Sequence, residues 1–235
     1  MEVELDNFEG KRYSQNGEDG VLRVIFDLIG TVERYYVEFG VGDGSECNTR
    51  NLRERYWFGL MMDREHEDLN INLRREFVTG ENVVELFQEY DVPLDFDLLS
   101  VDMDFNDFYV LRAILSGGYR PRVVVVEYNS YHPPDKDCVV EYDPSAVWDG
   151  TNYFGASILS YFRLGRANGY SLVYAERMGV NLFFVRDDCL ERSGVRFLHM
   201  NDVEKIYRSP GYGDNGHPVD PKERPFRTSG YPRGE

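Results

Sequence analysis

The stretch 122–128, RVVVVEY, constrains the fold most, because it is a β-branched run without polar alternation. Such a run is typical of a strand buried on both faces, as in parallel sheets. Six further runs have a β-rich character, at 35–41, 58–63, 76–83, 96–103, 171–177 and 181–186. Stretches with helical spacing accompany them, at 18–29, 46–56, 68–75, 108–115 and 152–168. This alternation predicts a mostly parallel sheet with helices on both faces.

Only three residues, 178–180, separate the last two predicted strands. Because a parallel crossover needs a much longer connection, these strands are predicted to form an antiparallel hairpin. We therefore expect an α/β, Rossmann-like, seven-stranded and mostly parallel sheet with a C-terminal antiparallel hairpin. A single domain over 1–208 would contain it. From Pro210 onward, 10 of 26 residues are Gly or Pro, so 209–235 is expected to be an extended or disordered tail.

The charge of the chain narrows the range of partners. With 42 acidic and 26 basic residues, the net charge is −16, which argues against nucleic-acid binding and against docking on an anionic membrane surface. No apolar run is long enough to span a membrane, and the acidic start MEVELDNFEG is unlike a signal peptide. Three separated cysteines fit a reducing compartment. We expect a cytoplasmic protein, and the sequence carries no signal for its oligomeric state.

The first predicted strand runs into a glycine-rich turn, VEFGVGDGSECN. Gly40, Gly42 and Gly44 allow a sharp bend and a close approach to a ligand, and a helix that follows would offer its positive N-terminus. Glu38 lies within an otherwise apolar run, where a carboxylate is costly unless it is bonded. A cationic ligand would offset that cost. The alternative is a tight turn without a ligand.

The second strand ends in Asp63, some 20 residues after the glycines. An acidic residue at this position can accept hydrogen bonds from ribose hydroxyls, although it can also cap a helix. Asn82, at the end of the third predicted strand, is a candidate for adenine contacts. These features predict a nucleoside cofactor. An NAD-linked enzyme is less favoured, because the glycines are not spaced as G-x-G-x-x-G, and it would require a parallel last strand.

The segments VEFGVGDGSECNTRNL, GLMMD and FDLLSVDMDFNDFYVLRAI together resemble class I methyltransferases that use S-adenosyl-L-methionine (SAM). The SQNGED sequence at 14–19 is similar to a motif of the FkbM-like group. The resemblance covers roughly 13–186, and it implies SAM as cofactor, with Gln15 and Asp19 near its site. The alternative is that Ser14 or Asn16 caps the helix over 18–29.

Acidic residues follow the fourth and fifth strands, in SVDMDFND and EYN. Since neighbouring strand ends face one ligand crevice, we expect Asp102, Asp104, Glu127 and Asn129 to converge. Oxygen ligands of this kind suit Mg²⁺ or another divalent cation. The pattern is similar to metal-dependent O-methyltransferases of the catechol type. Alternatively, Asp104 caps the next helix, or Asp102 contacts the cofactor without a metal.

The long loop at 129–150 adds two candidates for the acceptor side. His132 lies near the expected crevice and is a candidate base, with an ordinary surface histidine as the alternative. The aromatic residues of 148–154 are candidates for a pocket wall. We expect methyl transfer from SAM to a hydroxyl of a small-molecule acceptor, with Asp102, Asp104 and His132 as catalytic candidates. The alternative is a module that binds SAM or a nucleotide without catalysis.

Overall fold

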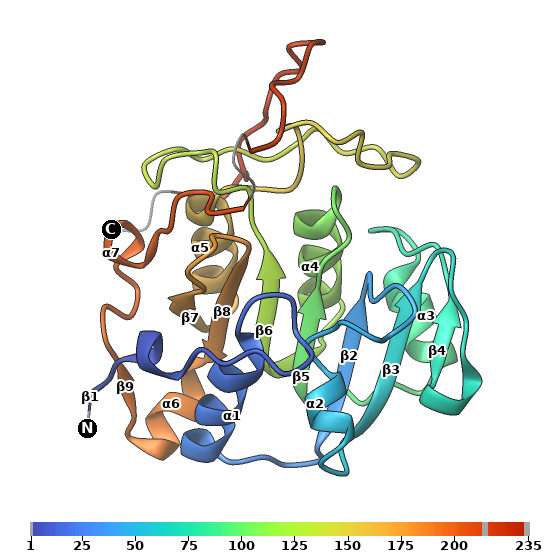
Figure 1. The fold of residues 1–235 in the computed structure, drawn as a ribbon, viewed down its shortest axis with the longest axis vertical. Helices are drawn as coiled ribbons and strands as arrows, with labels where there is room; N and C mark the ends of the chain where they lie inside the picture. The colour runs from blue at the N-terminus through green and yellow to red at the C-terminus, as the bar shows by residue number, and fades with distance from the viewer. Residues whose placement is uncertain (1, 213–215, 233–235) are drawn as a thin grey trace.

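A computed structural model describes residues 2–212 and 216–232. Its centre is a seven-stranded sheet with the strand order β4-β3-β2-β5-β6-β8-β7 (Figure 1). The strands are β2 (Tyr35–Phe39), β3 (Phe58–Asp63), β4 (Leu73–Arg75), β5 (Asp95–Val101), β6 (Arg120–Glu127), β7 (Tyr170–Ala175) and β8 (Asn181–Arg186).

The first five strands of this sheet are parallel, and β8 runs antiparallel to both β6 and β7. The predicted α/β fold with a mostly parallel seven-stranded sheet is thereby confirmed, and β7 and β8 form the expected antiparallel pair. The parallel last strand that an NAD-linked enzyme would require is not found.

Helices cover both faces of the sheet. One core unites the sheet with α1 (Glu18–Ile29), α2 (Arg50–Arg53) and α6 (Asp187–Ser193). The other unites it with α3 (Val83–Glu89), α4 (Asp107–Ser116) and α5 (Ile158–Ala167). Alternate residues of each strand serve the two cores, because successive side chains point to opposite faces. All five residues of β2 are buried, as expected for a central strand.

The remaining elements are short. They are β1 (Glu2–Val3), which pairs with β9 (Arg196–Phe197), the 3-10 turns η1 (Leu5–Phe8) and η2 (Leu69–Ile71), and α7 (Val203–Ile206). Within the described residues, no helix has both the length and the apolar character needed to cross a bilayer.

Several predicted elements differ from the structure. The third strand is Leu73–Arg75, where a helix was expected, because Leu73 is fully buried beside β3. The stretch 76–82 is irregular and leads into α3, which the sequence analysis missed along with α6. The helix expected at 46–56 shrinks to Arg50–Arg53, because the carboxylate of Glu38 binds the N–H groups of Asn48 and Thr49.

The helix expected at 152–168 begins only at Ile158. Ser157 is its N-cap and accepts a hydrogen bond from the Ser160 N–H. The preceding carbonyls of Asn152 and Phe154 instead accept bonds from the side-chain amide of Asn129. These bonds hold 152–156 in an irregular conformation.

The loop after β6 and the C-terminal segment lie together above the carboxyl ends of the parallel strands (Figure 1). Val139 forms antiparallel bridges with both Ala156 and Arg227, and the Ser229 hydroxyl donates to Asp137 at 3.0 Å. The described part of the predicted tail is therefore irregular but attached along the loop. Residues 213–215 and 233–235 of that tail lie outside the described residues.

Candidate functional site

The candidate site lies where the chain order of the sheet reverses, between β2 and β5. Ligands of open α/β sheets bind in the crevice at such a point. Gly40, which follows β2, has φ +70°, and a Cβ atom there would lie 1.6 Å from the carbonyl oxygen of Asp102. Only glycine permits this approach, so the glycine turn and the acidic loop after β5 meet at one edge.

A first cavity of about 280 Å³ opens on the β3 side of this point. Gly40, Gly42 and Asp63 contribute to its lining, as the sequence analysis predicted for a nucleoside site. Its apolar surfaces include the side chains of Met62, Phe77, Val78 and Phe105. The cavity thus combines a polar edge at the ends of β2 and β3 with apolar walls, as a flat heterocycle attached to a ribose requires.

Asp63 is fixed by the turns on either side of it. Its Oδ1 accepts the N–H groups of Glu65 and His66 at 2.8 and 3.0 Å and contacts the His66 ring nitrogen at 3.0 Å. Its Oδ2 accepts the N–H of Gly42 at 2.9 Å. Burial alone would raise the pKa of Asp63, but these hydrogen bonds outweigh it and hold the pKa below its ordinary value. A lone pair remains on Oδ2, enough for one hydroxyl.

A second cavity of about 440 Å³ adjoins the first. Four residues line both: Phe39, Gly40, Asp104 and Trp148. Five carboxylates line the second cavity, those of Glu38, Glu46, Asp102, Asp104 and Glu127. Its described lining contains no Lys or Arg. The second cavity is therefore strongly acidic, whereas the first has mixed charges.

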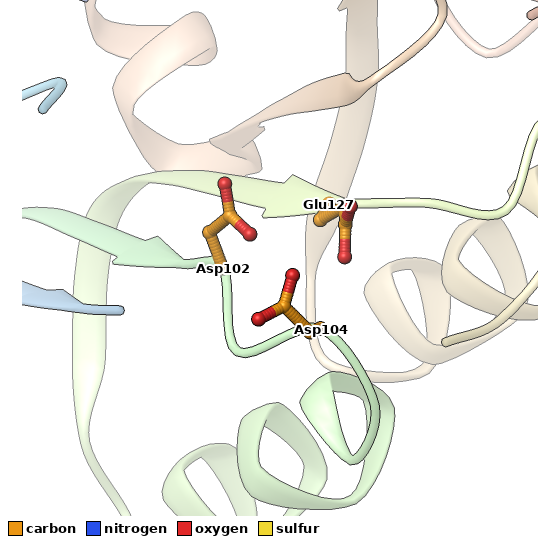
Figure 2. A group of neighbouring side chains, drawn as sticks. All are labelled: Asp102, Asp104 and Glu127. Carbon is orange, nitrogen blue, oxygen red and sulfur yellow. The ribbon is translucent and has the colours of Figure 1, made fainter. Parts of the chain in front are cut away.

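Three of these carboxylates point toward a common space (Figure 2). Asp102 follows β5, Asp104 precedes α4, and Glu127 ends β6. One oxygen from each lies within 4.8 Å of the oxygens chosen from the other two. Asp104 has φ +67°, a conformation that non-glycine residues adopt at a cost. The predicted convergence of these three residues is confirmed.

The charges in this cluster are not balanced by basic side chains. Burial, followed by the neighbouring carboxylates, raises the pKa values of Asp102 and Glu127 well above their ordinary range. Asp107, the first residue of α4, belongs to the same group, and burial raises its pKa to about 7. One oxygen each of Asp107 and Glu127, and the Tyr161 hydroxyl, are buried without a partner. Such groups are expensive unless protons or a cation satisfy them.

Glu38 is bonded within the protein. Its carboxylate accepts the N–H groups of Asn48 and Thr49 at 2.8 and 2.9 Å, and the hydroxyls of Thr49 and Ser100 at 2.5 and 3.3 Å. These bonds supply the compensation that the sequence analysis expected from a cationic ligand. Burial still raises the pKa of Glu38, and the residue lines the second cavity.

The N-terminal motif at 14–19 lies beside the second cavity, but its two acidic side chains bond to the backbone of the loop that precedes α1. Asp19 accepts the N–H groups of residues 12–14 through Oδ2, at 2.7 to 2.9 Å. Gly17 occupies the N-cap position of α1 and has no side chain to cap it, but the Ser14 hydroxyl accepts the N–H of Asp19 in the first turn at 3.2 Å. The alternative that Ser14 caps this helix is therefore confirmed, whereas Asn16 makes no such bond. These bonds place Gln15 in the lining of the cavity, as the resemblance implied, whereas Asp19 does not line it.

Gly44, Asn82 and Asn129 line neither cavity. The Asn82 side chain closes the turn before α3, accepting the Thr79 N–H at 2.7 Å. The Asn129 amide donates to two carbonyls of the loop, and its Oδ1 accepts the Tyr131 N–H at 3.1 Å. Asn129 therefore holds the loop, and its predicted role as a metal ligand gains no support.

His132 also lies outside both cavities. Its ring packs edge-on against Phe226, with the ring centroids 4.3 Å apart, and its Nε2 is buried without a partner. Burial lowers its pKa to about 4. This environment gives no support to the predicted catalytic role.

Replacing His132 by Phe is expected to make the protein less sensitive to acid. Between the ordinary pKa of 6.5 and the folded value of about 4, the unfolded chain binds a proton that the folded chain does not. When the pH is lowered from 7 to 5, His132 therefore decreases the free energy of unfolding of the wild type by about 1–2 kcal/mol. The His132→Phe variant should not show this decrease. Urea unfolding at both pH values measures the difference. Equal pH dependence in the two proteins would contradict the prediction.

Two residues of the second cavity come from the C-terminal segment, Tyr212 and His217. The sequence analysis missed them, because the Gly/Pro-rich composition around them indicates no fixed structure. Of the loop's aromatic residues that were candidates for a pocket wall, Trp148 and Phe154 line this cavity. Asp107 is part of the polar run after β5 in the sequence. Only its burial in the structure identifies it as a member of the carboxylate cluster.

Comparison of the chain with models of protein families and with curated proteins gives no match.

Proposed function

We propose that the protein transfers the methyl group of SAM to a hydroxyl oxygen of a small molecule. One observation carries this proposal: a cavity lined by the glycine turn, Asp63 and apolar side chains adjoins an acidic cavity at the reversal point of a mostly parallel sheet. The antiparallel strand β8 between β6 and β7 supports the finer assignment to a class I methyltransferase, since a mostly parallel sheet that ends in an antiparallel hairpin is the arrangement of that class. The assignment to the FkbM-like group rests on the SQNGED sequence at 14–19 alone.

The first cavity suits the adenosine part of SAM. Asp63 would accept a ribose hydroxyl at Oδ2, and Gly40 and Gly42 would permit close contact with the backbone. The aminoacyl part would extend toward Gln15 and Glu38 in the second cavity. With SAM bound in this way, the reacting methyl group would lie near Asp104, which lines both cavities.

The carboxylate cluster fits a divalent cation by its donor chemistry. Asp102, Asp104 and Glu127 supply only oxygen donors, and one oxygen of Glu127 is buried without a partner. Oxygen-only sets favour Mg²⁺ or Ca²⁺. A bound cation would lower the pKa of a hydroxyl beside it.

The protein's contribution to the reaction would be mainly alignment. SAM carries the methyl group on a sulfonium sulfur. On transfer, the sulfur would keep the electrons of the S–C bond and leave as a neutral thioether. The two cavities would bring the methyl carbon and the acceptor oxygen together, which would replace a bimolecular encounter by a positioned one. A carboxylate of Asp102 or Asp104 accepts the hydroxyl proton as the O–C bond forms.

Titration calorimetry of the full chain with SAM and S-adenosylhomocysteine tests the proposal. Both compounds are expected to bind, and Asp63→Ala is expected to weaken both by about tenfold, since a buried charged hydrogen bond is lost. Formation of S-adenosylhomocysteine in the presence of a panel of hydroxyl acceptors then separates catalysis from binding alone. Absence of any SAM uptake by the folded protein would overturn the proposal, and binding without turnover would favour the non-catalytic alternative.

A further inference from the structure

Four aromatic rings form one side of the second cavity. Trp148 and Phe154 come from the loop after β6, and Tyr212 and His217 come from the C-terminal segment. We call this set the aromatic wall. The ring of His217 contacts the other three, with centroid distances of 4.7 Å to Trp148, 5.7 Å to Phe154 and 5.0 Å to Tyr212. Residues some 60 positions apart in the chain thus make one surface.

The aromatic wall is held in place by contacts outside the cavity. Asn152 donates its N–H to the Pro218 carbonyl at 2.9 Å and accepts the Asp220 N–H through its side chain at 2.9 Å. Arg224 pairs with Asp149 at 2.6 Å and with Asp220 at 2.8 Å. The loop and the C-terminal segment are therefore joined immediately beside the wall, which makes it a preformed surface.

Among the residues that the structure describes, no Lys or Arg side chain lies over the rings of the aromatic wall. The described cation–π pairs place arginines over Tyr13, Tyr90, Phe108, Tyr109 and Tyr153, and none involves the aromatic wall. Among the lining carboxylates, Glu46 has a salt bridge with Lys11. The described residues provide no salt bridge for the other four.

Ring faces beside carboxylates, without a basic side chain, attract an organic cation through cation–π and ionic interactions. The first cavity differs, because the guanidinium-bearing residue Arg64 lines it together with acidic residues, whereas the described lining of the second contains neither Lys nor Arg. The preference for positive charge thus belongs to the second cavity, where the aminoacyl part of SAM would lie near Gln15 and Glu38 and the acceptor would lie beside the aromatic wall. We infer that the aromatic wall binds an ammonium group of the acceptor, which is a small molecule carrying both a hydroxyl and a protonated amine. The inference rests on the proposed function, because the ligand is a methyl acceptor only if the protein transfers a methyl group.

Three phenols with different side chains test the inference: tyramine, which carries an ammonium group, tyrosol, which carries a second hydroxyl, and 4-hydroxyphenylacetate, which carries a carboxylate. Each is titrated into the full chain with S-adenosylhomocysteine and MgCl₂ present. Tyramine is expected to bind about tenfold more tightly than tyrosol, and 4-hydroxyphenylacetate to bind more weakly than both. Equal binding of tyramine and tyrosol, or no binding of tyramine, would overturn the inference.

A pair of variants at position 217 separates ring chemistry from shape. His217→Phe keeps an aromatic face and should preserve the preference for tyramine over tyrosol, whereas His217→Leu should reduce it to about twofold. If His217→Leu instead weakens SAM relative to S-adenosylhomocysteine and leaves the tyramine preference intact, the wall serves the sulfonium and the inference is wrong. Failure of SAM to bind, with tyramine still preferred, would reject the proposed function but keep the ligand class.

Discussion

Replacing Asp102 by Asn is expected to abolish methyl transfer while making the folded protein more stable. The variant removes one of three converging carboxylates, and loss of a positioned proton acceptor lowers turnover by about 10²–10⁴-fold. It also removes a buried charge from a site where burial and the carboxylates of Asp107 and Asp104 raise its pKa. In the presence of a chelator at pH 8, the free energy of unfolding should rise by about 1–2 kcal/mol.

The stability difference between Asp102→Asn and the wild type should depend on pH. The pKa of Asp102 in the folded protein is raised. At low pH its carboxyl group is therefore protonated and neutral in the wild type. As the pH increases the group ionises, and the buried charge then lowers the free energy of unfolding. The stability gain in Asp102→Asn should therefore shrink as the pH falls. Added MgCl₂ should raise the melting temperature of the wild type more than that of the variant.

Asp135→Asn is a suitable control, because the Asp135 side chain is 63% exposed. It should change neither turnover nor the response to MgCl₂. If Asp102→Asn retains turnover within a few-fold of the wild type, or unfolds more easily at pH 8, the assignment of the cluster to function is wrong. Urea unfolding and formation of S-adenosylhomocysteine are the two measurements.

The buried strands and the C-terminal hairpin could be predicted because their signals are local. The run over β6 has no polar alternation, and only burial on both faces explains it. The hairpin of β7 and β8 follows from the length of its connection. The third strand was misplaced because β4 has only three residues, too few for a period, and its identity depends on pairing with β3.

The acidic cluster could be predicted for the same kind of reason. Asp102 and Glu127 follow neighbouring parallel strands, so the topology alone brings them to one edge. The residues of the aromatic wall from the C-terminal segment could not be predicted, because their place depends on ion pairs and backbone bonds far along the chain. Asn129 and His132 were assigned to the site by proximity in sequence, but the bonds and packing of the loop turn them away from it.

Asp97, a buried carboxylate within β5, differs in its surroundings from Asp102, which follows the same strand. It lies near the start of β5, at the opposite end of the sheet from the cavities, and it is fully buried. Its oxygens accept the N–H groups of residues 32–34 at 2.7 to 3.2 Å and a guanidinium bond from Arg122 at 2.9 Å. Arg122 also donates to the carbonyls of Ile29 and Gly30. Asp97 therefore joins β5 and β6 to the turn before β2.

Replacing Asp97 by Asn is accordingly expected to destabilise the protein by about 3–5 kcal/mol while leaving SAM binding by the folded fraction unchanged. The variant leaves the charge of Arg122 buried without its partner and turns an amide donor toward backbone N–H groups that need an acceptor. Urea unfolding at pH 7 measures the loss. The double variant Asp97→Asn with Arg122→Met should recover part of it, because the unpaired charge is gone. A loss below about 1 kcal/mol in the single variant would mean that this ion pair does not hold the sheet, and the contrast with Asp102 would no longer separate structural from functional acids.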